Sequence, residues 1–262
     1  MMNLHHYGEI KYLTFSNLDG DHRITHGIFQ RHGGCSPAPW CSLNLSTTVG
    51  DSRENVIENR TRIMRALGFP EDDFFDVWQI HSAKVVVIDR PRPREQTYIQ
   101  ADAIITNTPG VVLLMRFADC VPVLLFDPVN CVIGLAHAGW MGTVQKIARV
   151  AVENMHDSFG TNPQEIQACI GPSISSEQYP VGLDVINKVK NAFPNDWQAL
   201  VTLKNKQYHL DLWHSNEQTL REAGVANIIQ SNICTASNDN DWFSHRAEKG
   251  KTGRFAILLA IK

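Results

Sequence analysis

The chain has 262 residues, of which 43% are hydrophobic and 19% are charged, and its formal net charge is −3 at pH 7. This composition supports a full hydrophobic core and excludes an intrinsically disordered chain, and the small net charge argues against nucleic acid or an anionic membrane as the main partner. Apolar runs such as 256–261 have the length of strands rather than the roughly 20 residues of a membrane span, and residues 1–21 lack the apolar run of a signal peptide. We therefore expect a cytoplasmic protein without a membrane span.

The six cysteines, at positions 35, 41, 120, 131, 169 and 234, are expected to be reduced, because a cytosolic chain of this size with a good core needs no disulfides. No Cys-x-x-Cys pair occurs, and no pair of cysteines has the spacing of a zinc finger. We therefore expect no structural zinc module, and we expect most of these cysteines to be small buried apolar side chains.

The part of the chain before residue 118 is predicted to contain several strands and one long helix. Residues 1–22 have no clear assignment beyond one strand over 11–15. The helix covers 52–68, where Ser52 or Asp51 provides the N-terminal cap and Gly68 the C-terminal stop. Apolar and β-branched runs predict strands over 24–30, 75–79, 84–89, 101–106 and 111–117. A polar turn over 31–34 is followed by a loop over 35–48 that is long enough to be functional, which makes His32 and Asn44 candidates for substrate contact.

Two short apolar runs in the centre of the chain, 121–127 and 131–136, are separated by a turn that contains Pro128 and predict a pair of strands. Cys120 precedes the first strand and His137 follows the second. If the strands pair antiparallel, residues at their outer ends lie within about 5 Å of one another. The sequence therefore predicts a thiol and an imidazole side by side at one end of a sheet.

A helix is predicted directly after this pair of strands. Thr143 opens it, and apolar side chains at 144, 147, 151 and 155 form one face. Backbone N–H groups and the positive end of the helix dipole favour an anion at such an N-terminus. Gly139, Gly142 and Thr143 are therefore candidates for phosphate binding, although a Gly-x-x-Gly stretch before a helix is commonly only a tight turn.

Beyond this helix we expect strands over 166–170, 226–234 and 255–261 and helices over 181–192 and 210–223. The loop from Lys249 to Arg254 is basic and contains glycine, so it is either an anion-binding loop or an ordinary solvated loop. No internal repeat, low-complexity tract or interdomain linker occurs. We therefore expect one domain over 1–262, with 1–22 as its poorly assigned start.

His81, Cys120 and His137 each fall at the end of a predicted strand, and three chemistries suit them. Two imidazoles and a thiolate leave one corner of a tetrahedral zinc site open, which is the pattern of a catalytic zinc. Alternatively, His81 or His137 deprotonates Cys120 for nucleophilic attack without a metal, and Asp119 orients the base. Imidazole and thiolate also bind copper, but the His-x-His pairs of multicopper clusters are absent.

Other candidates depend on residue type and position alone. Arg60 lies one turn before the apolar Met64 on the predicted helix, so it is either solvated or buried with a partner. Tryptophan side chains are able to stack on a base, although aromatic residues more often belong to the core. The tryptophans considered for this role are Trp40, Trp78, Trp140 and Trp242.

A series of motifs in chain order carries a family resemblance. The most specific are Ala118-Asp119-Cys120-Val121-Pro122 and His137-Ala138-Gly139-Trp140. The others are Arg31-His32-Gly33-Gly34, Ser42-Leu43-Asn44-Leu45, Val49-Gly50-Asp51, Gln79-Ile80-His81, Ile170-Gly171-Pro172 and Thr252-Gly253-Arg254. From about Thr25 to the C-terminus, the chain resembles the YfiH-type family, which is also called the laccase-domain or multicopper polyphenol oxidase family.

The resemblance implies a single α+β domain of layered mixed β-sheets flanked by helices, similar to the cytotoxic necrotizing factor cysteine-hydrolase fold. It also implies a zinc site formed by His81, Cys120 and His137. Members of the family are regarded as purine nucleoside enzymes that cleave adenosine, inosine and methylthioadenosine with phosphate and also deaminate adenosine. An older description makes them copper-dependent polyphenol oxidases.

The sequence departs from the family pattern at two positions. Met141 stands where the family usually has arginine, and Phe117 stands where threonine commonly occurs. If that arginine contacts phosphate, Met141 removes a fixed charge and a bidentate donor. We expect Arg60, Arg246 or Arg254 to compensate for this loss.

We therefore expect an enzyme, namely a zinc-dependent purine nucleoside phosphorylase, which is a transferase, that also has the hydrolase activity of an adenosine deaminase. Its expected partners are a purine nucleoside and phosphate, and no oligomeric state is predicted. One alternative is a copper-dependent polyphenol oxidase, which is an oxidoreductase. The other is a metal-free Cys/His hydrolase.

Overall fold

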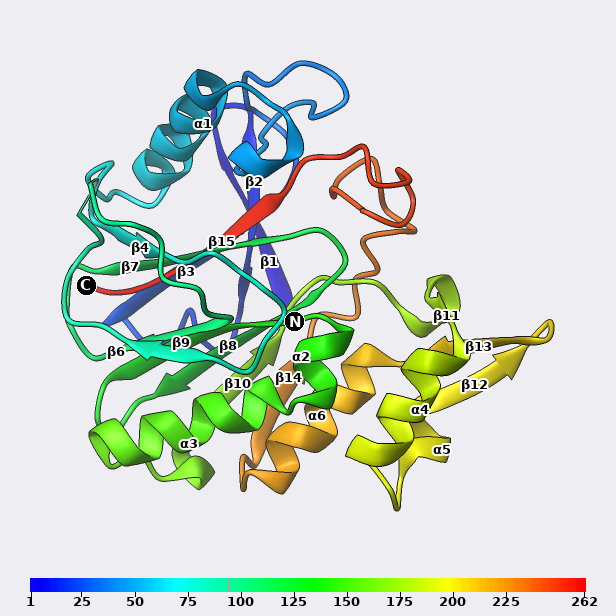
Figure 1. The fold of residues 1–262 in the computed structure, drawn as a ribbon. Helices are drawn as coiled ribbons and strands as arrows, with labels where there is room; N and C mark the ends of the chain where they lie inside the picture. Colours follow the sequence, from blue (N-terminus) through cyan, green and yellow to red (C-terminus); the bar gives the residue numbers. More distant parts are fainter. Residues whose placement is uncertain (94) are drawn as a thin grey trace.

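The structure is a computed structural model that describes residues 1–93 and 95–262, and two β-sheets lie face to face at its centre (Figure 1). Within these residues, the first sheet has six strands in the order β1 (Met2–Tyr7), β2 (Ile10–Phe15), β3 (Ile24–Phe29), β15 (Phe255–Ile261), β7 (Val112–Phe117) and β4 (Phe74–Asp76). The second sheet, counted over the same residues, has six strands in the order β14 (Asn227–Gln230), β10 (Gln167–Ile170), β8 (Val121–Asp127), β9 (Val132–Ala138), β6 (Ala103–Thr106) and β5 (Val85–Val87). Both sheets contain parallel and antiparallel neighbours, so both are mixed.

Helices cover the outer faces of both sheets (Figure 1). Helix α1 (Arg53–Ala66) lies on the first sheet, and α3 (Ile147–Phe159) and α6 (Leu212–Glu222) lie on the second, with the short α2 (Trp140–Val144) between β9 and α3. To one side, α4 (Leu183–Ala192) and α5 (Trp197–Leu200) lie beside a small sheet of β11 (Pro180–Val181), β13 (Gln207–Leu210) and β12 (Val201–Lys204). Short 3₁₀ turns are η1 (Thr47–Val49), η2 (Pro163–Glu165) and η3 (Ser176–Gln178). This arrangement confirms the expected α+β fold of layered mixed sheets flanked by helices.

Separate apolar clusters fill the spaces between these layers. In β8, Leu124 and Phe126 belong to the cluster between the two sheets, whereas Val123 and Leu125 belong to the cluster beneath the helices of the second sheet. Successive side chains of a strand point to opposite faces, so a strand that is covered on both faces needs apolar residues at every position. This double burial explains why β8 is a continuous apolar run rather than an alternating one.

The chain crosses from the first sheet to the second twice at the same end of the molecule. Strand β4 is followed by β5, and β7 is followed directly by β8. His81 lies on the first of these connections and Cys120 lies on the second. Strand β9 brings His137 to the same end, because it pairs antiparallel with β8 and places His137 opposite Pro122. The predicted strand pair, with a thiol and an imidazole at one end, is therefore confirmed.

Some predicted elements differ in the structure. The single helix expected from Thr143 is two helices, because Lys146 adopts left-handed backbone geometry with φ of 61° and interrupts it. Residues 1–22 contain a hairpin of β1 and β2, of which only part of the second strand was predicted. The helix expected from 181 begins at Leu183, because Pro180–Val181 pairs with β13 as a strand. Over the described ranges, no helix is long and apolar enough to cross a lipid bilayer.

Candidate active site

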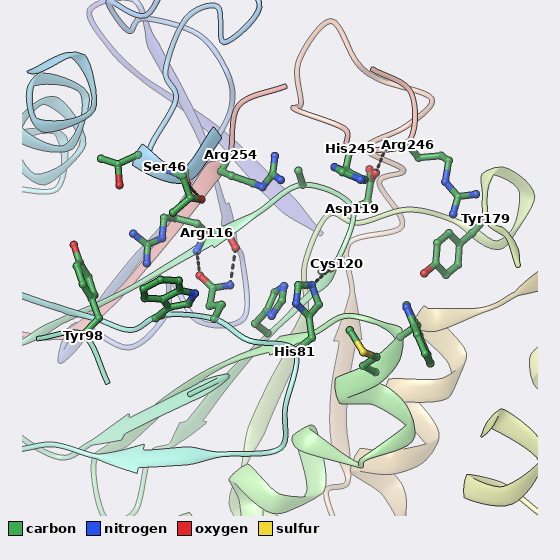
Figure 2. Close-up of a pocket in the computed structure, with 18 residues that line it drawn as sticks. Ser46, His81, Tyr98, Arg116, Asp119, Cys120, Tyr179, His245, Arg246 and Arg254 are labelled. Atoms are coloured by element: carbon green, nitrogen blue, oxygen red, sulfur yellow. Dashed lines mark hydrogen bonds between the residues drawn. The ribbon is translucent and has the colours of Figure 1, made fainter. Parts of the chain in front are cut away.

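A cavity of about 610 Å³ opens at the end of the sheets where β7 leads into β8 (Figure 2). This volume is in the range of sites that bind small molecules. His81, Cys120 and His137 all line the cavity. The aromatic and basic side chains around them are Trp78, Tyr98, Trp140, Tyr179, Arg116, His245, Arg246 and Arg254.

His81, Cys120 and His137 form a compact cluster of donor atoms, which all lie within 4.8 Å of one another. Cys120 Sγ is 3.9 Å from His81 Nε2, and the two imidazole rings are 4.9 Å apart at an interplanar angle of 71°. In the part of the chain that the structure describes, this is the one group of three or more histidine, cysteine or acidic side chains with such spacing. Two imidazoles and a thiolate are a donor set that fits zinc, and copper accepts the same atoms.

Asp102, which was not predicted from the sequence, positions both histidines. Its buried carboxylate lies 2.9 Å from His137 Nδ1. The same carboxylate accepts hydrogen bonds from the backbone N–H groups of Ile80, His81 and Ser82 at 3.2, 3.0 and 2.6 Å. These bonds stabilise the left-handed backbone of His81, whose φ is 59°. One carboxylate therefore orients two of the three donors.

The ionisation of Asp102 decides which nitrogen of His137 is free. Burial raises the pKa of Asp102, but hydrogen bonds from His137 and Ser82 lower it below its usual value, so the carboxylate is ionised at neutral pH. An ionised carboxylate only accepts hydrogen bonds, so His137 donates from Nδ1. Nε2 of His137 is then the atom available to a metal or to the Cys120 thiol.

In the metal-free protein, Cys120 and His137 also shift each other's ionisation. Burial raises the pKa of the Cys120 thiol, but the neighbouring His137 and His81 lower it to about 6. Burial lowers the pKa of His137, but Cys120 and Asp102 raise it to about 9. The pair is therefore a thiolate and an imidazolium at neutral pH, and the thiolate is the form that serves as a metal ligand or a nucleophile.

Asp119 does not orient a histidine, so this part of the metal-free interpretation is wrong. Its carboxylate accepts hydrogen bonds from the hydroxyls of Thr235 and Ser244, both at 2.7 Å, and from the backbone N–H of Arg246 at 2.6 Å. Asp119 therefore holds the C-terminal loop against the turn that precedes Cys120 (Figure 2). The orienting role belongs to Asp102.

Arg254 and Arg246, both predicted to meet phosphate, line the cavity. Arg254 is largely buried, and its guanidinium donates to the carbonyls of Thr252 and Gly253 at 3.4 and 2.8 Å. Burial lowers its pKa, and no carboxylate of the described residues forms an ion pair with it. A buried cation without a carboxylate favours an anionic ligand. Arg246 is more exposed and donates to the Pro180 carbonyl at 2.9 Å.

Comparison with known proteins decides the family. The family model described as multi-copper polyphenol oxidoreductase laccase matches residues 25–262. The chain belongs to this family. It is 40% identical to the purine nucleoside phosphorylase of Deinococcus radiodurans over 91% of this chain and 89% of that protein. It is 34% identical to a protein named adenosine deaminase RL5 from an unknown prokaryotic organism, over 82% of this chain and 85% of that one. The crystal structure of YlmD from Geobacillus stearothermophilus superimposes with a TM-score of 0.93, is 30% identical and covers 100% of both chains.

Two residues of the family motifs, His32 and Asn44, lie outside the cavity wall, although both were predicted to contact substrate. His32 Nε2 lies 2.8 Å from a carboxylate oxygen of Asp241. Asn44 is fully buried, and its side-chain oxygen accepts hydrogen bonds from the backbone N–H groups of Ser46 and Arg254 at 3.1 and 2.9 Å. Asn44 therefore shapes the loops that carry cavity residues and does not itself face the cavity.

Arg60 is also outside the cavity wall, and it is largely buried. Its guanidinium lies 4.8 Å from the centre of the Phe74 ring. Burial lowers its pKa, and the charge of Asp76 opposes this shift. Arg60 is therefore packed on Phe74 rather than fully solvated, but its buried Nε has no hydrogen-bond partner among the described residues. A role in replacing the family arginine at position 141 has no support from its location.

The start of α2 lies beside the donor cluster. Gly142 and Thr143 are buried behind the cavity wall, and the Thr143 hydroxyl accepts a hydrogen bond from Asn216 at 3.0 Å. At Gly139, an added Cβ would lie 2.9 Å from Cys120 Sγ and 3.0 Å from His81 Cδ2. Gly139 therefore leaves space for the donor cluster. Within 139–143, Trp140 and Met141 line the cavity whereas Gly142 and Thr143 do not, and the phosphate site expected there stays a prediction.

Arg116 is a cavity residue that was not predicted from the sequence. Its guanidinium donates to the carbonyl of Val77 at 2.6 Å and lies 3.3 Å from a carboxylate oxygen of the buried Asp76. The sequence did contain a sign of this role, namely a charged residue inside the apolar run of β7. Charged side chains in buried strands require a partner, so such a residue is a candidate for a site.

Proposed function

We propose that the protein is a zinc-dependent purine nucleoside phosphorylase that acts on adenosine, inosine and methylthioadenosine and that also deaminates adenosine. The observation that carries the proposal is the cluster of His81, Cys120 and His137 in a cavity of about 610 Å³. The name of the Deinococcus radiodurans relative supports the first activity, and the name of the adenosine deaminase RL5 supports the second. We also propose that the enzyme acts in the cytoplasm on these small molecules and not on nucleic acid or membranes.

In this proposal, His81, Cys120 and His137 hold the zinc, which would supply Lewis-acid polarisation of a bound group. Asp102 accepts the Nδ1 proton of His137, so Nε2 is the nitrogen that would face the zinc after losing its own proton. Arg254 meets the phosphate as a buried cation, and the more exposed Arg246 adds a second positive charge. In this proposal Arg254 and Arg246 supply the positive charge at the phosphate. An arginine at position 141, where this chain has Met141, is therefore not required.

The two reactions differ in the bond that breaks. In phosphorolysis, the bond between C1′ of the ribose and the purine nitrogen breaks, a phosphate oxygen bonds to C1′, and the purine leaves with a proton. In deamination, water replaces the amino group at C6 of adenosine, which leaves as ammonia. A fixed cation beside the phosphate stabilises the transition state of phosphorolysis, because the negative charge of the attacking phosphate lies next to it. Deamination needs no phosphate, so the two activities separate in one assay.

Two further functions each have an observation in favour. The family description and the imidazole and thiolate donors favour a copper-dependent polyphenol oxidase, but the described residues hold one such cluster rather than several. The arrangement of Asp102, His137 and Cys120, with the thiol pKa lowered to about 6, favours a metal-free cysteine hydrolase. Metal content and thiol reactivity distinguish these functions from the phosphorylase.

The test combines metal analysis with product analysis. Protein purified without added metal is analysed for zinc and copper, and it is then incubated with inosine or adenosine, with and without phosphate. We expect about one zinc per chain and phosphate-dependent base release that is lost in Cys120→Ala. Cys131→Ala is the matched control, because Cys131 lies in the turn between β8 and β9, at the other end of the same strand pair.

Other results would contradict the proposal. Base release that does not depend on phosphate would exclude a phosphorylase. Oxygen uptake with phenols by the copper-loaded protein, without base release, would favour the oxidase. A Cys120 that is rapidly alkylated in the active, metal-free protein would favour the hydrolase.

A further inference from the structure

The cavity extends to both sides of the donor cluster. Figure 2 shows Tyr179 and Arg246 on one side of Cys120 and Tyr98 and Arg116 on the other. A nucleoside and a phosphate occupy different parts of such a cavity. The location of the purine ring therefore depends on which side has an aromatic ring free to stack and polar groups that match the base. The aromatic residues of the two sides differ in the contacts that they already make.

On the side of Tyr179, the aromatic rings are already packed by the protein. Tyr179 and Trp140 both pack against the apolar cluster beneath the helices of the second sheet. The guanidinium of Arg246 lies 4.8 Å from the centre of the Tyr179 ring, and the ammonium of Lys188 lies 5.1 Å from that of Trp140. These rings are therefore partly buried and already in contact with other protein groups, which leaves less of their surface to a ligand.

Trp78, on the other side, has no comparable packing. It is 55% exposed, lines the cavity and belongs to none of the apolar clusters formed by the described residues. Its backbone is nevertheless fixed, because its N–H donates to the Ile99 carbonyl at 2.9 Å and its carbonyl accepts from Ala101 at 3.2 Å. An exposed indole on a fixed backbone at a cavity wall is suited to stacking against a planar ring.

Arg116 supplies the polar edge on this side. Its side chain is 14% exposed, and the Val77 carbonyl and the Asp76 carboxylate hold its guanidinium in place. A guanidinium only donates hydrogen bonds. A 6-oxopurine presents two acceptors, O6 and N7, that match arginine in a bidentate pair, whereas adenine carries a donor at the corresponding N6 position. The donor character of Arg116 therefore favours hypoxanthine or guanine over adenine.

We propose that Trp78 and Arg116 form the base subsite of this cavity and that the subsite selects 6-oxopurines. This inference rests on the proposed function, because it assumes a purine occupant. It places the base on the side of Cys120 opposite Tyr179. It also ranks inosine and guanosine above adenosine as substrates for phosphorolysis.

The test measures the binding of hypoxanthine and adenine to the purified protein by isothermal titration calorimetry. We expect the wild type to bind hypoxanthine more tightly than adenine. Trp78→Ala should weaken both bases by about 10-fold or more, because stacking contributes on this scale, and Trp78→Phe should restore most of the loss. Arg116→Lys keeps the charge but removes the planar pair of donors, so it should reduce the preference for hypoxanthine by about 10-fold.

Three outcomes would overturn the inference. These are unchanged binding in Trp78→Ala, an unchanged preference in Arg116→Lys, and a loss in Trp140→Phe that exceeds the loss in Trp78→Ala. The last would place the base on the side of Tyr179. Failure of the proposed function is recognised separately, because wild-type protein would then release no base from inosine with phosphate. If the wild type cleaves inosine and Trp78→Ala is unaffected, only the inference fails.

Discussion

Replacing Asp102 by asparagine tests the central claim that one carboxylate orients the donor cluster. In the wild type, Oδ2 of Asp102 accepts from Ile80 and Ser82, and Oδ1 accepts from His81 and His137. An asparagine keeps one acceptor oxygen and replaces the other by an NH₂ donor. If the oxygen stays with Ser82, the NH₂ group faces His81 N–H and His137 Nδ1.

The expected losses of zinc affinity and of stability follow from this mismatch of hydrogen-bonding groups. His137 satisfies the new donor by accepting at Nδ1, which moves its proton to Nε2, the atom that a metal needs. Loss of such an orienting partner lowers metal affinity about 10- to 100-fold, which equals about 1.4–2.7 kcal/mol. The backbone N–H of His81 is left without an acceptor, which should lower the free energy of unfolding of the metal-free protein by about 1–3 kcal/mol.

The assay is competition for zinc between the protein and a chromogenic chelator, together with urea unfolding of the metal-free protein. Asp127→Asn is the matched control, because Asp127 is also a fully buried carboxylate that accepts from backbone N–H groups, those of Val129 and Asn130. It lies at the opposite end of β8 from the site. The control should be less stable but should bind zinc normally. An unchanged zinc affinity in Asp102→Asn would refute the reasoning.

Three other changes have predictable effects. Gly139→Ala places a Cβ 2.9 Å from Cys120 Sγ, so we expect the purified variant to contain little zinc per chain. Arg254→Met removes the cation that we propose to bind phosphate, so KM for phosphate should rise about 10- to 100-fold while KM for inosine changes little. Burial lowers the pKa of His26 to about 4, and its Nε2 accepts from the backbone N–H of Phe15 at 2.7 Å. Because the pKa of an unfolded histidine is about 6.5, only the unfolded state gains this proton as the pH falls from about 6.5 to about 4. Stability should therefore fall over this range by up to about 3 kcal/mol, and His26→Gln should remove this loss in urea unfolding.

Each of these predictions has a control or an outcome that contradicts it. Gly20→Ala should keep its zinc, because the nearest atom to an added Cβ is 3.9 Å away. If Arg246→Met raised KM for phosphate more than Arg254→Met, the phosphate would lie at the more exposed arginine. Equal pH dependence of unfolding in the wild type and in His26→Gln would show that another group causes it.

The core strands were predictable from sequence because burial on both faces leaves an unbroken apolar run. Strands β8 and β15 have this pattern and were predicted with the bounds that the structure shows. Strands β1 and β12 are both mostly exposed, and β1 contains two histidines, so neither has an apolar run to detect. Local sequence also has no signal for the break at Lys146, because a lysine with positive φ is imposed by the packing around it.

The donor cluster was predictable for a different reason. Cys120 directly precedes β8, and His137 lies near the end of β9. The register of this strand pair follows from a short turn, so the proximity of the two residues follows from local pairing. Asp102 belongs to a neighbouring strand region, and its hydrogen bond to His137 depends on the pairing of β6 with β9, which is not local in sequence. Asn44 was predicted as a substrate contact because a conspicuous polar residue in a loop has the same sequence signal whether it binds a ligand or supports the loop.

The two crossings between the sheets have a consequence for the dynamics of the whole molecule. His81 and Cys120 lie on the segments that join the first sheet to the second, and His137 belongs to the second. An ion bound to all three would cross-link the sheets at that end, and its binding energy would oppose their separation because the separated sheets do not hold the donors together. Amide hydrogen exchange in β7 and β8 should therefore slow on zinc binding by the same factor, so that both strands open in one cooperative step.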